Sequence, residues 1–165
     1  MKRLFITVSI AVFLLYLPNR IQAQTTQTKL NQVELFKQFI GTWKCELAQD
    51  TTLIVYVKSY GNGLDYYIKT ETKGKILTEG KALMGFDKNS DKGIQAEIMN
   101  SPDITLWVVW FTSKNICKTI QYQHISNPES APKYVLFEFK SPDLLIQTFK
   151  ENNKTLNSFS FLKER

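Results

Sequence analysis

Residues 52–73 read TLIVYVKSYGNGLDYYIKTETK, and this stretch decides the fold. The turn at residues 61–63, Gly-Asn-Gly, stands between two runs rich in β-branched and aromatic residues. Gly and Asn accept the positive φ angles of a tight turn at little cost. In the second run Leu64, Tyr66 and Ile68 share one face, which is typical of a strand that buries one side. The stretch therefore predicts an antiparallel β-hairpin.

The same rhythm of strand, short polar turn and strand recurs along most of the chain. No helical pattern separates the strands, and the connections are rich in Gly, Asn, Asp, Ser and Pro. An open sheet of ten strands would leave two long apolar edges, whereas a closed barrel leaves none. The sequence therefore predicts an all-β protein, a ten-stranded antiparallel up-and-down β-barrel. The expected strands cover residues 42–49, 52–60, 64–73, 76–87, 94–98, 104–111, 116–123, 134–140, 144–150 and 155–162.

One short amphipathic helix is predicted before the first strand, over residues 30–40. Asn31 followed by Glu34 resembles a capping arrangement at its start, and Gly41 ends it. Its apolar stripe consists of Leu30, Val33, Phe36, Phe39 and Ile40.

The N-terminal segment predicts export. Lys2 and Arg3 precede an apolar stretch over residues 4–17, and the small residue Ala23 follows it. This order is typical of a secretory signal peptide, and the stretch is shorter than the roughly 20 residues needed to span a bilayer. We expect residues 1–24 to be removed and residues 25–165 to form a single domain, periplasmic or secreted, with no membrane span after processing.

The charge indicates a solvated surface. The formal net charge of +6 falls to +3 without Lys2, Arg3 and Arg20, and the remaining charges of both signs are mixed along the chain. A protein that binds nucleic acid would gather its positive charge on one face, so no nucleic-acid partner is expected.

A Gly-x-Trp motif, Gly41-Thr42-Trp43, opens the first strand, and Gly85-Phe86-Asp87 follows about forty residues later. With the helix and the strand count, these motifs resemble the calycin superfamily, which contains lipocalins, fatty-acid-binding proteins and nitrobindin-like barrels. The chain is most similar to exported bacterial lipocalin-like domains. The resemblance implies that a basic side chain after the last strand packs over Trp43. Arg165 and Lys163 are the two candidates, and a loose terminal Arg165 is the alternative.

The strand pattern predicts a barrel interior lined by apolar and aromatic side chains. Two interpretations remain open: the side chains fill the barrel completely, or they surround a cavity that buries an apolar ligand. The expected lining is Trp43, Val55, Val57, Tyr66, Ile68, Met84, Phe86, Ile94, Ile98, Phe137, Phe139, Phe159 and Phe161.

Cys45 and Cys117 are the two cysteines of the chain. Export would permit a disulfide between them, and two buried thiols that act as small apolar residues are the alternative.

The sequence carries no catalytic or metal-binding signature, so we expect a protein that is not an enzyme. His124 is the single histidine, whereas a zinc site needs three or four protein ligands. Nitrobindin-like barrels hold haem iron through a histidine near the end of the chain, and residues 155–162 contain none. Neither a metal nor a cofactor such as haem is therefore expected.

Residues 104–111, ITLWVVWF, are apolar on both faces. The predicted helix, a partner subunit or neither would cover the outer face, and an exposed outer face would favour a homodimer through Ile104–Phe111. Two functions follow. The first is an exported carrier or sensor of a small apolar ligand, and the second is a non-catalytic interaction or scaffold module that uses its outer surface. The turn near residue 50 is too short for the helical lid of fatty-acid-binding proteins, so their ligand is not carried over.

Overall fold

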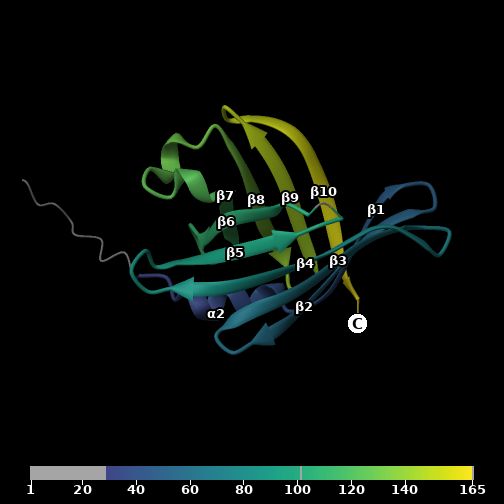
Figure 1. The fold of residues 1–165 in the computed structure, drawn as a ribbon, viewed down its shortest axis with the longest axis horizontal. Helices are drawn as coiled ribbons and strands as arrows, with labels where there is room; N and C mark the ends of the chain where they lie inside the picture. Colours follow the sequence, from purple (N-terminus) through teal and green to yellow (C-terminus); the bar gives the residue numbers. More distant parts are fainter. Residues whose placement is uncertain (1–28, 101, 165) are drawn as a thin grey trace, which may run out of the picture.

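The computed structural model describes residues 29–100 and 102–164, which form a closed ten-stranded antiparallel β-barrel (Figure 1). Each strand pairs with its neighbours in the chain, and β1 pairs with β10 to close the barrel. The predicted fold class, an all-β up-and-down barrel with one short N-terminal helix, is confirmed. The predicted signal peptide, residues 1–24, lies outside the described residues. The strands are β1 (Gly41–Ala48), β2 (Thr51–Tyr60), β3 (Gly63–Thr72), β4 (Lys75–Asp87), β5 (Lys92–Ile98), β6 (Ile104–Phe111), β7 (Ile116–Gln121), β8 (Lys133–Ser141), β9 (Leu144–Glu151) and β10 (Lys154–Glu164).

The helix is shorter than its apolar stripe predicts. α2 (Gln32–Phe36) continues for one 3₁₀ turn as η1 (Lys37–Phe39), and Ile40 is already extended. The N-terminal cap is confirmed, because Oδ1 of Asn31 accepts a hydrogen bond from the backbone N–H of Glu34 at 3.2 Å. The side-chain spacing fits a helix through Ile40, but the chain must turn there to enter β1.

α2 lies across one end of the barrel, where it contacts β3 and β6 (purple in Figure 1). Its Gln32 is buried and makes two hydrogen bonds with the backbone of Phe111. The side-chain amide donates to the carbonyl oxygen at 3.1 Å, and the backbone N–H donates to the side-chain oxygen at 2.7 Å. Phe36 and Phe39 enter the core beside the strands. The helix therefore closes this end of the barrel and does not cover the outer face of β6.

The Gly-x-Trp motif joins the helix to the closing strands. Trp43 is buried, and its indole N–H donates to the carbonyl oxygen of Phe39 at 2.7 Å. The Nζ of Lys163 lies 5.1 Å from the centre of the indole ring, a cation–π contact of about 0.5 to 2 kcal/mol. Of the two candidates for this position, Lys163 fills it, and Arg165 lies outside the described residues. Gly41 makes the contact possible, because a Cβ there would overlap the Cε of Lys163.

A second apolar cluster lies on the outer side of β6 and β7. Val108, Ile120 and Ala131 are buried in it, with Ile94, Trp110, Ile125 and Tyr134 around them. Part of this cluster comes from the connection between β7 and β8, which holds η2 (Tyr122–His124) and η3 (Pro128–Ser130). The chain's own connection therefore covers part of the outer face of β6, while Ile104 and Leu106 stay exposed.

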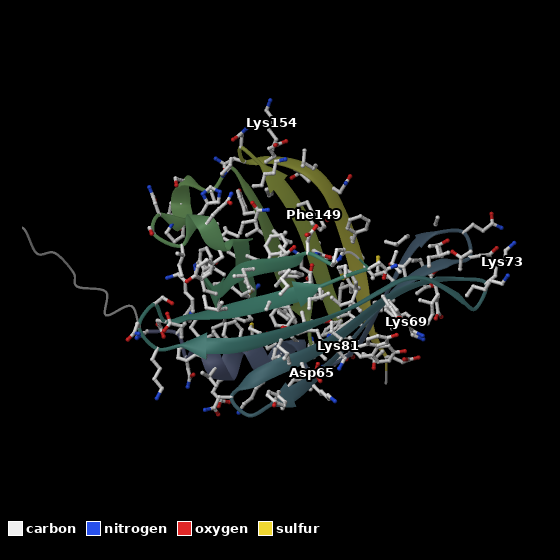
Figure 2. All side chains as sticks on the ribbon, in the orientation of Figure 1. Asp65, Lys69, Lys73, Lys81, Phe149 and Lys154 are labelled. Atoms are coloured by element: carbon white, nitrogen blue, oxygen red, sulfur yellow. The ribbon has the colours of Figure 1, made fainter. Side chains whose placement is uncertain are left out.

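Charged side chains of both signs cover the outside of the barrel. Lys73 and Lys154 point away from it at the ends of hairpins (Figure 2). Asp65 pairs with Lys58 at 3.3 Å and with Lys81 at 3.7 Å across neighbouring strands. Among the described residues, no helix has the length and apolar character that a membrane crossing requires.

We predict that Gly41→Ala destabilises the protein by about 1 to 3 kcal/mol in urea unfolding. The φ angle of Gly41 is +133°, which L-residues rarely adopt, and the new methyl group would displace Lys163 from Trp43. Gly85→Ala is the matched control, because nothing lies within 4 Å of a Cβ built at Gly85. Equal unfolding free energies for the two variants would contradict the role given to Gly41.

Candidate functional site

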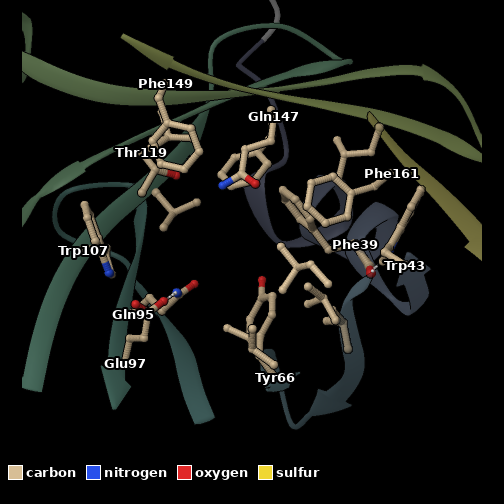
Figure 3. A pocket seen from close by; sticks show the side chains of 18 residues that line it. Phe39, Trp43, Tyr66, Gln95, Glu97, Trp107, Thr119, Gln147, Phe149 and Phe161 are labelled. Carbon is tan, nitrogen blue, oxygen red and sulfur yellow. Dashed lines mark hydrogen bonds between the residues drawn. The ribbon is translucent and has the colours of Figure 1, made fainter. Parts of the chain in front are cut away.

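A cavity of about 240 Å³ lies inside the barrel (Figure 3). A cavity of about 150 Å³ binds benzene, so this one has room for about ten non-hydrogen atoms. Most of its 18 lining residues are apolar. The apolar lining consists of Phe39, Trp43, Leu53, Val55, Val57, Ile68, Val109, Val135, Phe137, Leu145, Phe149 and Phe161. The indole N–H of Trp43 is bonded to Phe39, and the other lining side chains that carry a polar group are Tyr66, Gln95, Glu97, Trp107, Thr119 and Gln147.

The structure brings part of the predicted lining together around this cavity. These residues alternate along their strands, as an inward face requires. They are Trp43, Val55, Val57, Tyr66, Ile68, Phe137 and Phe161.

Four other residues of the predicted lining belong to the packed core instead. Met84 and Phe139 are buried, and Phe86 is partly buried against the same cluster. Phe139 packs against Phe39, with ring centres 5.0 Å apart, and Phe159 packs edge-on against Phe149 at 6.0 Å. Alternation predicts which side of a strand a residue occupies, but not its depth along the barrel axis, so it cannot separate core from cavity.

The predicted inward orientation of Ile94 and Ile98 is wrong. Gln95 pairs with Met84 and Glu97 pairs with Ala82, so these polar residues face inward. Ile94 packs in the outer cluster, and Ile98 is exposed. The alternation along β5 is real, but its apolar side faces outward because the outer cluster provides a second place to bury Ile94.

β5, β6 and β7 together form a polar wall in the cavity, defined by Gln95, Glu97, Trp107 and Thr119. Figure 3 shows these side chains on one side of the space and Phe39 and others on the opposite side. Gln95 pairs with Trp107 across β5 and β6, and its amide Nε2 lies 3.5 Å from Oε2 of Glu97. The sequence analysis did not predict this wall. Gln95 and Glu97 alternate with Ile94 and Ile98 along β5, and the apolar pair was expected to face inward.

Two groups of the polar wall are buried without a hydrogen-bond partner among the described residues. They are the hydroxyl of Thr119, a residue with 7% of its surface exposed, and the indole N–H of Trp107. An unsatisfied buried polar group costs about 1 to 3 kcal/mol. The Trp107 N–H faces the Glu97 carboxyl, whereas the Thr119 hydroxyl faces no acceptor or donor among the described residues of the chain. Such groups are rare in native proteins, so the Thr119 hydroxyl indicates a place for a polar group from outside the chain.

Glu97 and Tyr66 are the titratable side chains in the lining. Burial raises the pKa of the Glu97 carboxyl, and the facing indole of Trp107 and amide of Gln95 offset this only in part. Glu97 makes no ion pair with any described residue. Burial also raises the pKa of Tyr66 far above its usual range, so its hydroxyl stays neutral and points into the cavity (Figure 3).

Cys45 and Cys117 are free, buried thiols, and the disulfide considered from the sequence is not formed in the structure. Burial raises the pKa of both thiols, so they stay protonated at neutral pH. A protonated thiol is a poor nucleophile, and these two residues act as apolar parts of the core.

His124 lies in η2, outside the cavity lining, with its Nε2 3.3 Å from the amide nitrogen of Gln123. Within residues 29–100 and 102–164, no group of three or more His, Cys, Asp or Glu side chains has an arrangement that could hold a metal ion.

We predict that Glu97→Gln stabilises the protein at about pH 7 by no more than about 1 kcal/mol. A carboxyl whose pKa is raised by folding binds more protons folded than unfolded, so the wild type loses stability as the pH rises above about 4. The gain should vanish below about pH 4. Urea unfolding at both pH values measures it, with Glu46→Gln on the exposed face of β1 as the control. A less stable Glu97→Gln variant at neutral pH would contradict the assignment.

The similarity of this chain to known proteins was tested by two comparisons. A scan against models of known protein families finds no match, and a search of the curated proteins finds none. The fold and the cavity therefore carry the functional argument.

Proposed function

We propose that this protein binds a small apolar molecule inside its barrel and acts as an exported carrier or sensor. The observation that carries the proposal is the cavity of about 240 Å³, whose walls are mostly apolar and aromatic. Burial of apolar surface contributes about 25 cal/mol per Å² to binding such a molecule, before the costs of association. A barrel of this size has room for its own side chains and one small ligand.

The proposed role is not catalytic. Glu97 and Tyr66 are the titratable groups in the lining, and no lining residue forms an acid–base or nucleophile–base pair with either of them. Catalysis of proton or group transfer needs such convergent groups. Binding needs only the apolar walls and a few polar groups that orient the ligand.

The calycin resemblance and the predicted signal peptide support the same proposal. In the calycin barrels that the chain resembles, the Gly-x-Trp motif marks the closed end of a ligand-binding barrel. In this chain Gly41, Trp43 and Lys163 meet at the end closed by α2.

We predict that toluene raises the thermal unfolding temperature of the wild type, because a ligand that binds only the folded state stabilises it by mass action. Val55→Trp should remove this shift by filling the cavity. Tyr56→Trp, at the next position of β2, should keep the shift, because Tyr56 faces outward against Tyr67. Equal shifts in the two variants would place toluene outside the cavity. A separate measurement, native mass spectrometry of protein purified from its own host, identifies the resident molecule.

A second candidate function uses the outer surface. Exposed apolar residues lie opposite each other across three strands: Leu83 pairs with Ala96, Ala96 with Leu106, and Ile98 with Ile104. Ile104 keeps 62% of its surface exposed. A contiguous apolar patch of this kind favours a second copy of the chain as its partner.

For this candidate we predict that the double variant Ile104→Lys and Leu106→Lys is monomeric under conditions in which the wild type is a dimer. Two buried lysine charges without partners would oppose the contact. Sedimentation velocity measures the difference, and Leu156→Lys, an exposed leucine on β10, is the control. A monomeric wild type at high concentration would remove the candidate.

A further inference from the structure

The charges around the cavity have one sign. Glu97 contributes a carboxylate, and the 18 lining residues include no lysine, arginine or histidine. Lys163, which pairs with Trp43 in the strand register, lies over the indole of that residue and is not part of the lining. Lys81 is paired with Asp65 on the outer face. Among the lining residues, a ligand therefore meets one negative charge and no positive charge.

The polar wall is also rich in hydrogen-bond acceptors. The Glu97 carboxylate offers two oxygens with about four acceptor positions between them. The side-chain oxygen of Gln95 and the unpartnered hydroxyl of Thr119 add two more acceptors on neighbouring strands. The Trp107 N–H and the Gln95 amide face the same carboxylate and leave part of its acceptor positions free. A group with several N–H donors fits this wall.

An anionic head group does not fit it. A carboxylate on the ligand would lie beside Glu97 in a partly buried site, where like charges repel more strongly than in water. Its oxygens would find neutral N–H and O–H donors in Trp107, Thr119, Tyr66 and the two glutamines, but no opposite charge among the lining residues. Burial of a charge without an opposite charge is costly.

We propose that the ligand of this barrel is a small apolar amine whose ammonium group lies against Glu97. This inference rests on the proposed interior binding and adds the charge of the head group. The apolar body lies among Phe39, Trp43 and Phe161, across the cavity from the polar wall (Figure 3), and the ammonium donates to Glu97. The ammonium stabilises the partly buried carboxylate, which has no cation of the chain beside it.

The test compares three probes that share a phenyl ring and a two-carbon arm: phenethylamine, phenethyl alcohol and phenylacetate. Each has about ten non-hydrogen atoms, which the cavity volume allows. Isothermal titration calorimetry at neutral pH should give about tenfold tighter binding of the amine than of the alcohol, as a charge-assisted hydrogen bond provides. Phenylacetate should bind more weakly than the alcohol.

Glu97→Gln removes the carboxylate charge and keeps the size of the side chain, so it tests the charge independently of the cavity. In this variant the amine should lose its tenfold advantage, while the alcohol binds as in the wild type and shows that the cavity is intact. Glu46→Gln, on the exposed face of β1, should keep the wild-type order of the three probes.

The outcomes distinguish the two proposals. If the alcohol binds and the amine binds no tighter, interior binding stands and the amine assignment is overturned. Tightest binding of phenylacetate would also overturn the assignment, and would point to Lys163 as its partner. If none of the three probes binds, interior binding itself fails at this ligand size.

Discussion

The contact between Trp43 and the end of the helix is the constraint on which the rest of the barrel depends. The indole N–H bonds to the carbonyl of Phe39, so the helix is fixed to β1 at its last turn. In the register, Trp43 lies beside Val55 of β2 and Lys163 of β10, at the seam where the barrel closes. Lys163 covers the ring in the space left by the missing side chain of Gly41. One tryptophan thus ties together the helix, the first strand and the last strand, and the cavity acquires a closed end.

With that end fixed, the register of β5 decides what the cavity presents. Ile94 has an apolar place outside the barrel, beside Val108 and Ile120, under the connection that contains η2 and η3. Strand alternation then obliges Gln95 and Glu97 to face inward. The outer cluster and the polar wall are therefore two consequences of one register. A slip by one residue would bury Ile94 and Ile98 inside and remove the acceptors from the cavity.

The alternation along β3 and the strand rhythm of the whole chain are enough to predict the barrel and the inward positions of Val55, Val57, Tyr66 and Ile68. The same reasoning fails for β5, since local alternation cannot show that a distant connection covers the outer face. The cap at Asn31 follows from local chemistry and was predictable, whereas the entry of Phe39 into the cavity depends on the Trp43 contact. For Met84 and Phe139 the inward direction was correct, but their depth along the axis is set by packing against the helix. The local pattern thus predicts whether a side chain points into the barrel. Long-range packing decides where along the barrel axis the side chain lies and whether it reaches the cavity.

The cavity lowers the stability of the folded protein. Filling it with larger apolar side chains would add buried surface, and replacing Thr119 by valine would remove an unsatisfied hydroxyl. Either change is available by single substitutions, and stabilising changes of this kind often reduce function where a site needs the unfavourable groups. Glu97 adds to the cost, because a partly buried carboxylate without a cation is less stable than a neutral residue in its place. Three separate costs, the empty volume, the unpaired hydroxyl and the unpaired charge, coincide in one space. A ligand with an apolar body and an ammonium head group fills the volume and pairs the charge at once.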